Sequence, residues 1–400
     1  MFAQKQLTIE QCETFFLKNN FLLIAEQYNI VASQAGVVQA AIWEQPYFNA
    51  EFNFVNPEAG AVFDVGKNGQ KAFAIQQLIY LGGKKKSEIA LARSNQAIAE
   101  MEFEQLVRQL KFEIATSFYT LFFEINKASS IEEQLQNVDR LTDAYAEQVK
   151  RGNIALKDLV RLQSLSLNIK SQLSAIRQNI FQAQSNLKLL TGLDSLIVPA
   201  GGEQISDEDF VKVLSYNSDQ IKERAIGKNT EILIAEKMVA NAELYLQWQK
   251  TLNTPDLTLG PSYDQRGGAF ANQVNMNLGI SLPFWRRNRG NISIAKAQSI
   301  QSSVLKDHKT LELKTKIDNT INNLLHQQQL YKNFGPEILP NAELVYRGML
   351  ANFQKQNISL IEFTDFIESY SQSILLINEI KKQIVLFGEE LNFLVNEKLF

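Results

Sequence analysis

Residues 273–285 read QVNMNLGISLPFW, and the basic run RRNRG follows directly at 286–290. Apolar side chains occupy every second position of this stretch, with polar or small side chains between them. The apolar set is Val274, Met276, Leu278, Ile280, Leu282 and Phe284, and the set between them is Gln273, Asn275, Asn277, Gly279 and Ser281. A period of two predicts a β-strand with one apolar and one polar face. We therefore expect a strand over 273–284 that ends in an aromatic pair and arginines.

Three more segments carry the same alternation. Residues 46–55 place Phe48 and Phe52 on one face, with Asn49 and Glu51 on the other. Residues 69–80 and 254–264 alternate as well, and connections rich in Gly, Asn and Asp lie between the members of each pair. The sequence thus predicts four strands, arranged as two pairs.

The two halves of the chain resemble each other. AIWEQPYFNAEFNFVN (41–56) matches LQWQKTLNTPDLTLGPSYD (246–264) in character, and RGNIALKDLVRLQS (151–164) matches KQNISLIEFTDFIES (355–369). Ala90 aligns with Ala295 and Asn153 aligns with Asn357, which are shifts along the chain of 205 and 204 residues. Separate segments thus give nearly the same shift. This pattern favours a duplication. We expect one structural unit over 1–400, made of a first repeat (1–200) and a second repeat (201–400).

Long helices account for most of the remaining chain. Residues 84–150 contain no proline, which predicts one unbroken helix, whereas Gly335-Pro336 predicts that the matching helix of the second half is broken into two pieces. Apolar residues then recur in heptads, which predicts coiled-coil packing. The heptad positions are Leu162, Ile169, Ile176, Ala183 and Leu190 in the first half, and Phe363, Ile367, Tyr370, Ile374, Ile377, Ile384, Leu391 and Val395 in the second, with Lys381 interrupting.

The net charge and the spacing of reactive residues argue against nucleic-acid binding, catalysis and metal binding. The 400-residue chain has a formal net charge of −3, which gives no reason to expect nucleic-acid binding. Its one cysteine, Cys12, lies in a helical pattern and is expected to be a buried small hydrophobe. No catalytic constellation is evident, and His308 and His326 lie too far apart to share a metal. We expect no enzyme activity, no cofactor and no resident metal.

The strands allow two interpretations: a small sheet packed on the helices with its polar face in water, or part of a membrane β-barrel. Aromatic and basic residues near the helix-side ends of the strands favour the barrel, because such residues gather where hydrocarbon meets headgroups. This expected interface belt comprises Trp43, Tyr80, Trp248 and Trp285, with Lys84, Lys85, Arg286 and Arg287 just beyond. Four strands cannot close a barrel, so the chain is expected to oligomerise around a polar, water-filled pore.

Together these features resemble the TolC-type outer-membrane efflux proteins over nearly the whole chain. The likeness includes LTIEQCETFFLKNN (7–20), LGGKKKSEIALA (81–92) and the duplicated order of strand pair and helical hairpin. ISLPFWRRNRGNISIA (280–295) is most similar to the branch that serves heavy-metal resistance–nodulation–division (RND) pumps. The resemblance implies a mainly α protein with a membrane β-barrel portion. It also implies a homotrimer with a twelve-stranded β-barrel in the outer membrane and coiled-coil helices that form an α-barrel across the periplasm.

The same resemblance implies a function. The trimer would be the exit duct of a tripartite efflux system, passively conducting substrates such as metal ions or drugs after removal of a signal peptide. Its partners would be a periplasmic adaptor protein, an inner-membrane RND pump and outer-membrane lipid. Two alternatives stay open from the residues alone: a soluble coiled-coil scaffold or stalk, and a secreted pore-forming protein.

In this family the helix–helix turns at the periplasmic tip carry a G-x-x-x-L-x-D motif, which implies adaptor-docking turns at Gly152 and Leu156 and, in the second copy, at Gln356 and Leu360. Gln356 stands where glycine is usual. Around a threefold axis the nearby carboxylates would form an anionic gate. These are Asp158, Glu362 and Asp365. A different interpretation is also open, because Ser359-x-x-Glu362 fits a helix capping box.

Overall fold

The computed structural model describes residues 4–57, 60–67, 69–201, 205–212, 214, 216–267, 269–282 and 288–400, with the side chains of 335–339 left undescribed. The chain is mostly helical and divides into two compact units. Unit 1 contains residues 1–26, 103–232 and 310–400, and unit 2 contains residues 27–102 and 233–309. Each unit therefore draws segments from both halves of the sequence.

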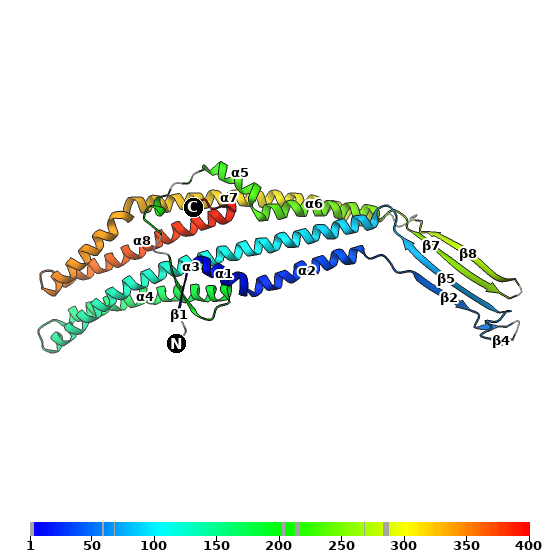
Figure 1. The fold of residues 1–400 in the computed structure, drawn as a ribbon. Coiled ribbons are helices and arrows are strands. Elements are labelled where there is room, and N and C mark those ends of the chain that lie inside the picture. Colours follow the sequence, from blue (N-terminus) through cyan, green and yellow to red (C-terminus); the bar gives the residue numbers. More distant parts are fainter. Residues whose placement is uncertain are drawn as a thin grey trace. The chain divides into compact units, whose positions relative to one another are not determined.

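The helices follow the same order in each half (Figure 1). The first half contains α1 (Ile9–Asn19), α2 (Phe21–Ala41), α3 (Lys84–Lys150) and α4 (Leu156–Thr191). The second half contains α5 (Ser218–Lys228), α6 (Thr230–Thr251), α7 (Arg289–Gln354) and α8 (Leu360–Val395). α3 and α7 have 67 and 66 residues, and α4 and α8 have 36 each. The division of the chain by duplication into two repeats that meet at residue 200 stays a prediction.

Two buried asparagines determine where the first helix of each half ends. Asn20 Oδ1 accepts from the backbone N–H groups of Leu22 and Leu23, and its Nδ2 donates to Leu190 O over 2.9 Å. Asn229 makes the same bonds to Glu231, Ile232 and Leu394. Each asparagine thereby caps the next helix and ties its start to the end of a hairpin helix.

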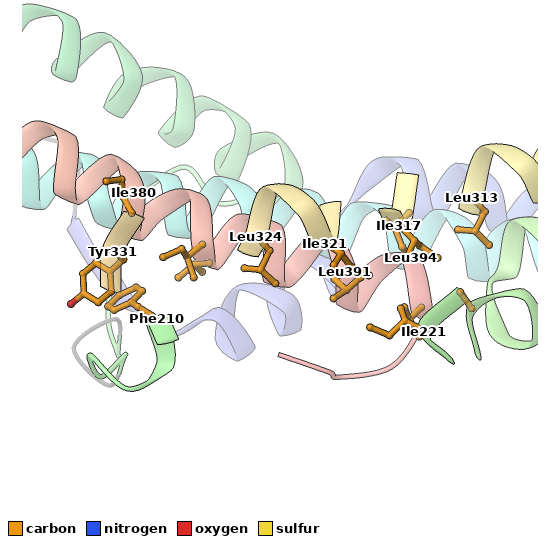
Figure 2. Close-up of a cluster of buried hydrophobic side chains, with 14 of the residues drawn as sticks. Phe210, Ile221, Leu313, Ile317, Ile321, Leu324, Tyr331, Ile380, Leu391 and Leu394 are labelled. Atoms are coloured by element: carbon orange, nitrogen blue, oxygen red, sulfur yellow. The ribbon is translucent and has the colours of Figure 1, made fainter. Parts of the chain in front are cut away.

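The expected heptads in α4 and α8 are confirmed as buried stripes. In Figure 2, Leu313, Ile317, Ile321 and Leu324 of α7 lie among Ile380, Leu391 and Leu394 of α8 and Ile221 of α5. Tyr331 and Phe210 pack against each other at one end of this cluster, with tilted rings whose centroids are 5.2 Å apart. Apolar burial of this kind is the main source of stability for long helices.

The prediction for α3 is confirmed, but the predicted break at Gly335-Pro336 is wrong, because α7 is one helix from Arg289 to Gln354. A proline removes one backbone donor and distorts one turn. Apolar packing on both sides outweighs that local cost: Tyr331 is buried before the proline, and Tyr346 and Phe353 are buried after it. Among the described residues, no helix is both long and apolar enough to cross a membrane.

Unit 2 contains a four-stranded antiparallel sheet in the order β2-β5-β7-β8 (Figure 1). Its strands are β2 (Tyr47–Phe52), β5 (Gln70–Ile79), β7 (Leu257–Arg266) and β8 (Phe270–Ile280). All four predicted strands are present, with three corrections. The strand expected over 254–264 begins at Leu257 and ends at Arg266. The strand expected over 46–55 ends at Phe52, because the chain bends there and β3 (Val55–Asn56) pairs separately with β4 (Ala61–Val62). The strand expected over 273–284 begins at Phe270 and ends at Ile280, and Phe284 lies outside the described residues.

Unit 1 also contains a short parallel pair, β1 (Gln4–Leu7) with β6 (Leu196–Pro199), and a 3-10 turn, η2 (Asp209–Val211). Gln184 of α4 exchanges two hydrogen bonds with the backbone of Ile197, which fixes β6 against the helix. The β1–β6 pair thus joins the segment before α1 to the segment that follows α4.

Candidate functional site

The sheet has one apolar and one polar face, as its sequence predicts. Directly paired residues point to the same side of an antiparallel sheet, and the register pairs Phe73 with Ala50 and with Tyr263, and Tyr263 with Val274. Because the register holds across all four strands, the apolar positions collect on a single side. We call this side the apolar sheet face; its members are Phe48, Phe52, Phe73, Ile75, Leu259, Tyr263, Val274, Met276, Leu278 and Ile280.

The apolar sheet face is exposed in the single chain. Val274 is 76% exposed, and Met276, Leu278 and Phe48 are exposed to a similar extent. Its aromatic rings pack mainly on one another: the Phe73 ring centroid lies 6.3 Å from those of Phe48 and Tyr263 and 5.7 Å from that of Phe52. Exposed apolar side chains gathered on one face of a sheet indicate contact with a membrane or a partner.

The opposite face is polar. It carries Asn49 and Glu51 of β2, Ser262 of β7, and Asn275 and Asn277 of β8. Gln70 Nε2 donates to Glu51 Oε1 over 3.0 Å, so neighbouring strands also share polar contacts on this side. Such a face is suited to water.

The two outer strands of the sheet, β2 and β8, are its edges. Each edge presents backbone donors and acceptors that have no neighbouring strand on their outer side. Both β2 and β8 can therefore form backbone hydrogen bonds with a further strand on their outer side.

The expected interface belt lies beside the helix-side ends of the strands. The ring centroids of Trp43 and Tyr80 are 6.0 Å apart, and the Tyr80 hydroxyl bonds Glu44 over 3.1 Å. Trp248 lies on α6 beside Tyr245, at 5.8 Å between centroids. Trp285, Arg286 and Arg287 fall outside the described residues.

The two lysines expected in the belt have partners within the chain. Lys84 Nζ lies 2.7 Å from Asp256 Oδ2, with the Lys84 side chain only 9% exposed. Lys85 Nζ bonds Glu88 and lies 5.6 Å from the centroid of the Tyr80 ring. Lys84 therefore joins the start of α3 to the start of β7, a role that its sequence position did not predict.

The turns of the two helical hairpins in unit 1 share one geometry. Gly152 N–H donates to Val149 O, and Asn153 N–H donates to Gln148 O, each over 2.9 Å. Gln356 N–H and Asn357 N–H donate to Phe353 O and Asn352 O over the same distances. Both patterns are Schellman caps, in which the residue after the helix adopts a left-handed conformation. Gly152 has φ +76° and Gln356 has φ +60°.

No protein-family model matches the chain. The chain is 19% identical over 367 residues to the cobalt-zinc-cadmium resistance protein CzcC of Cupriavidus metallidurans, covering 91% of this chain and 84% of CzcC. Its structure is similar to that of CusC, with a TM-score of 0.76 and 16% identity over 98% of this chain and 92% of CusC. It is also similar to the CmeC outer membrane channel of Campylobacter jejuni, with a TM-score of 0.78 and 12% identity over 98% of this chain and 86% of CmeC.

The chain has the fold of the TolC-type outer-membrane channels. This confirms the resemblance predicted from the sequence and the mainly helical fold class with its small set of strands. In this TolC-type fold, the motif residues of both hairpins lie at their turns. Leu156 is 63% exposed in the first turn of α4, and Leu360 is half-buried in the first turn of α8.

The expected gate carboxylates of the TolC-type fold occupy different environments. Glu362 forms the capping box: its Oε2 accepts from the backbone N–H and the hydroxyl of Ser359, each over 2.8 Å. These two hydrogen bonds lower the pKa of Glu362. Asp158 is half-buried, and the pKa of Tyr145 is raised by burial and then by the charge of Asp158. Asp365 is exposed on the first turns of α8.

A buried cluster of charges, which we call the charge square, was missed from the sequence. Lys127 Nζ lies 2.8 Å from Glu124 and 2.6 Å from Glu379, and Lys382 Nζ lies 2.9 Å and 2.7 Å from the same two carboxylates. Burial alone would raise the pKa of Glu379, but hydrogen bonds from Gln383, Lys127 and Lys382 lower it to about 2. Two Glu-x-x-Lys pairs within apolar heptads were the available signal, but their contact across α3 and α8 is non-local.

Proposed function

We propose that three copies of this chain form the outer-membrane exit duct of a tripartite efflux system. The observation that carries the proposal is the sheet register, which gathers the apolar side chains on one exposed face of a sheet with two open edges. Open edges are not tolerated in hydrocarbon, so the sheet requires neighbouring strands to span a membrane. Three sheets of four strands would close a twelve-stranded barrel, consistent with the TolC-type fold.

In this arrangement the polar sheet face lines a water-filled lumen. Asn49, Asn275 and Asn277 would face the conducted solutes, which pass without being chemically changed. The duct itself supplies no energy: an inner-membrane RND pump, joined through a periplasmic adaptor, would drive export. The chain would act in the outer membrane after removal of a signal peptide, and not as an enzyme.

Similarity to CzcC supports exported substrates of the metal-ion kind, with drugs as the other class. Deleting the gene and measuring growth across metal salts and drugs separates these classes. Increased sensitivity to divalent metal ions alone would assign the duct to metal export, and sensitivity to drugs alone would assign it to drug export.

The register offers a direct test of the membrane proposal. Leu278→Arg places a charge on the apolar sheet face, level with Gln77. A charge on such a face costs about 2–4 kcal/mol at the bilayer midplane and less toward the boundaries. Asn277→Arg places the same charge one residue away, on the polar face. We expect Leu278→Arg to block assembly in the outer membrane, and Asn277→Arg to assemble with altered conductance. Equal assembly of the two variants would contradict the proposal.

We also propose that Asp158, Glu362 and Asp365 form an anionic ring at the periplasmic entrance of the trimer, and that the turns at Gly152, Leu156, Gln356 and Leu360 contact the adaptor. The hydrogen bonds from Ser359 lower the pKa of Glu362 and so favour its charged form. Like charges around a narrow opening attract cations and bind multivalent ones.

Two pairs of substitutions separate gating from helix capping. Glu362→Gln with Asp365→Asn removes both charges but keeps a hydrogen-bonding cap, and the double alanine variant removes both charge and cap. We expect both pairs to lose block by trivalent cations in planar bilayers, and only the alanine pair to lose stability, by about 0.5–2 kcal/mol. If the neutral pair is blocked like the parent, the gate lies elsewhere.

A further inference from the structure

The connection between β2 and β5 carries an exposed apolar surface. The chain leaves β2, forms the short pair β3–β4 and returns to β5, and Figure 1 shows this pair at the end of the sheet away from α3 and α6. Five apolar side chains of this connection are exposed, of which Val65 is the least so, at 38%. The four that are more than half exposed form what we call the hairpin patch: Phe54 (65%), Val55 (54%), Val62 (68%) and Phe63 (58%).

The conformation of the hairpin patch is well stabilised by hydrogen bonds even though its side chains face outward. Phe63 has φ +55°, which is unfavourable for a bulky residue. Its N–H donates to Phe54 O over 2.9 Å, and its carbonyl accepts from Val65 N–H over 3.0 Å. The two rings pack edge to face, with centroids 5.4 Å apart. The chain therefore holds a costly backbone conformation that presents two rings to the surroundings.

The spacing along the sheet indicates what those surroundings are. Asn53 N–H donates to Gln70 O over 3.2 Å, so the hairpin begins level with the start of β5, ten residues from Tyr80. At a rise of about 3.3 Å per residue this is roughly 33 Å along the strand, and roughly 25 Å along the membrane normal at a usual barrel tilt. The apolar band of a membrane barrel has this height. If Trp43 and Tyr80 mark one boundary of the band, the hairpin patch lies at the other.

The chemistry of the hairpin patch points to the same surroundings. Its four side chains carry no polar atom, so they offer a protein partner no hydrogen bond or charge. The nearby polar contact, from Asn56 Nδ2 to Asp64 Oδ2, belongs to the hairpin itself. Phe54 keeps the sequence alternation of Phe48 and Phe52, and the hairpin patch begins directly after β2 ends at Phe52.

We propose that the β3–β4 hairpin is a lipid anchor that inserts the hairpin patch just beneath the headgroups of the outer leaflet. This rests on the proposed function, because it requires the apolar sheet face to lie in a membrane. The hairpin would fix the height of the barrel in the bilayer at the boundary opposite Trp43 and Tyr80.

Fluorescent labelling in lipid vesicles tests the proposal. In a Cys12→Ala background, Val62→Cys is labelled with an environment-sensitive dye, which leaves both rings of the hairpin patch in place. The trimer is reconstituted into phosphatidylcholine vesicles whose acyl chains carry a nitroxide quencher either near the headgroup or near the chain end. Leu278→Cys is the matched control on the apolar sheet face, and Asn277→Cys is the control on the polar face.

We expect the Val62 label to be quenched most by the shallow nitroxide, the Leu278 label to be quenched by the deep nitroxide more than the Val62 label is, and the Asn277 label to be quenched by aqueous iodide. Phe54→Asn with Phe63→Asn should shift the Val62 label from lipid quenching to iodide quenching. Quenching of the Val62 label by iodide alone would overturn the proposal, as would protection from both quenchers, which indicates burial against a second copy. If the Leu278 label escapes lipid quenching as well, the proposed membrane function itself is wrong.

Discussion

The turns of the two helical hairpins reach one backbone geometry by different means. The α3–α4 turn uses Gly152, which adopts φ +76° without a steric penalty, but the cap of α4, Ala155, makes no side-chain bond. The α7–α8 turn uses Gln356 at φ +60°, which is unfavourable for a residue with a side chain, and has a full capping box between Ser359 and Glu362. Each turn thus lacks one stabilising feature that the other has.

The comparison shows that a missing glycine need not change a turn. The two Schellman hydrogen bonds have the same lengths in both hairpins, and each turn adds an asparagine side-chain bond, from Asn153 to Gln148 and from Asn357 to Asn352. The backbone of the two turns is therefore alike although their sequences differ, whereas the motif side chains are not, since Leu156 is 63% exposed and Leu360 is half-buried.

The largest expected effect concerns how the hairpins are joined. The charge square links α3 of the first hairpin to α8 of the second, whereas Glu132 and Arg177 link α3 to α4 through an exposed pair. Lys127→Met leaves the buried Glu124 and the half-buried Glu379 with one lysine fewer, and we expect a loss on the order of 3 kcal/mol. Arg177→Met should cost about 0.5 kcal/mol. Denaturation of the detergent-solubilised protein, followed by circular dichroism, checks the ranking; equal losses would contradict it.

The charge square also predicts a sensitivity to acid. The pKa of Glu379 is about 2 in the folded protein and 4.5 when the side chain makes no interactions. The ionised Glu379 therefore contributes fully to the stability of the fold above about pH 4.5. That contribution is lost as the pH falls from 4.5 toward 2. The melting temperature of the parent should fall in this range, and Glu379→Gln should reduce the slope. A slope unchanged by Glu379→Gln would show that other groups control acid unfolding.

A smaller effect is expected from exchanging the turn residues. Gly152→Ala introduces a side chain at positive φ and should cost about 1 kcal/mol, whereas Gln356→Gly relieves the same strain and should stabilise the second hairpin by a similar or smaller amount. Melting temperatures of the two variants measure both effects. Opposite signs support the comparison, and a loss of stability in both variants would mean that Gln356 makes a contact of its own.

Effects of the same size or smaller are expected from exchanging the caps. Ser359→Ala removes the capping box of α8 and should cost about 1 kcal/mol, while Ala155→Ser supplies the missing cap of α4 and should add about 0.5 kcal/mol. Combining Gln356→Gly with Ala155→Ser would give both turns both features. If Ala155→Ser brings no gain, the bare cap of α4 is satisfied by another contact.

Local sequence patterns predicted most of this fold. Alternation identified the four strands, and heptads identified the buried residues of α4 and α8, because both depend on which face of one element is apolar. The split after Phe52 was not predicted, since the pairing of β3 with β4 competes with an alternation that continues through Phe54. The continuity of α7 through Pro336 depends on packing by Tyr331 and Tyr346, which a local proline rule cannot include.

The residues of the candidate sites also divide into those that local sequence patterns identify and those whose partners are far away in sequence. The motif Gly152-x-x-x-Leu156-x-Asp158 and the capping box at Glu362 are local, and both lie at turns of the hairpins, while their roles in docking and gating stay predictions. The partners of Lys84 and Lys382 lie far away in sequence, at Asp256 and Glu124, so no spacing rule could identify them. The sequence signal identified the ion-pairing residues as charged positions without showing that they are buried.

The central claim is that three chains complete one barrel, and the mass of the complex in mild detergent tests it most directly. We predict a single species of three chains, because the edges at β2 and β8 must each find a neighbouring strand. A stable monomer that stays in water without detergent, with its apolar sheet face exposed, would contradict the account.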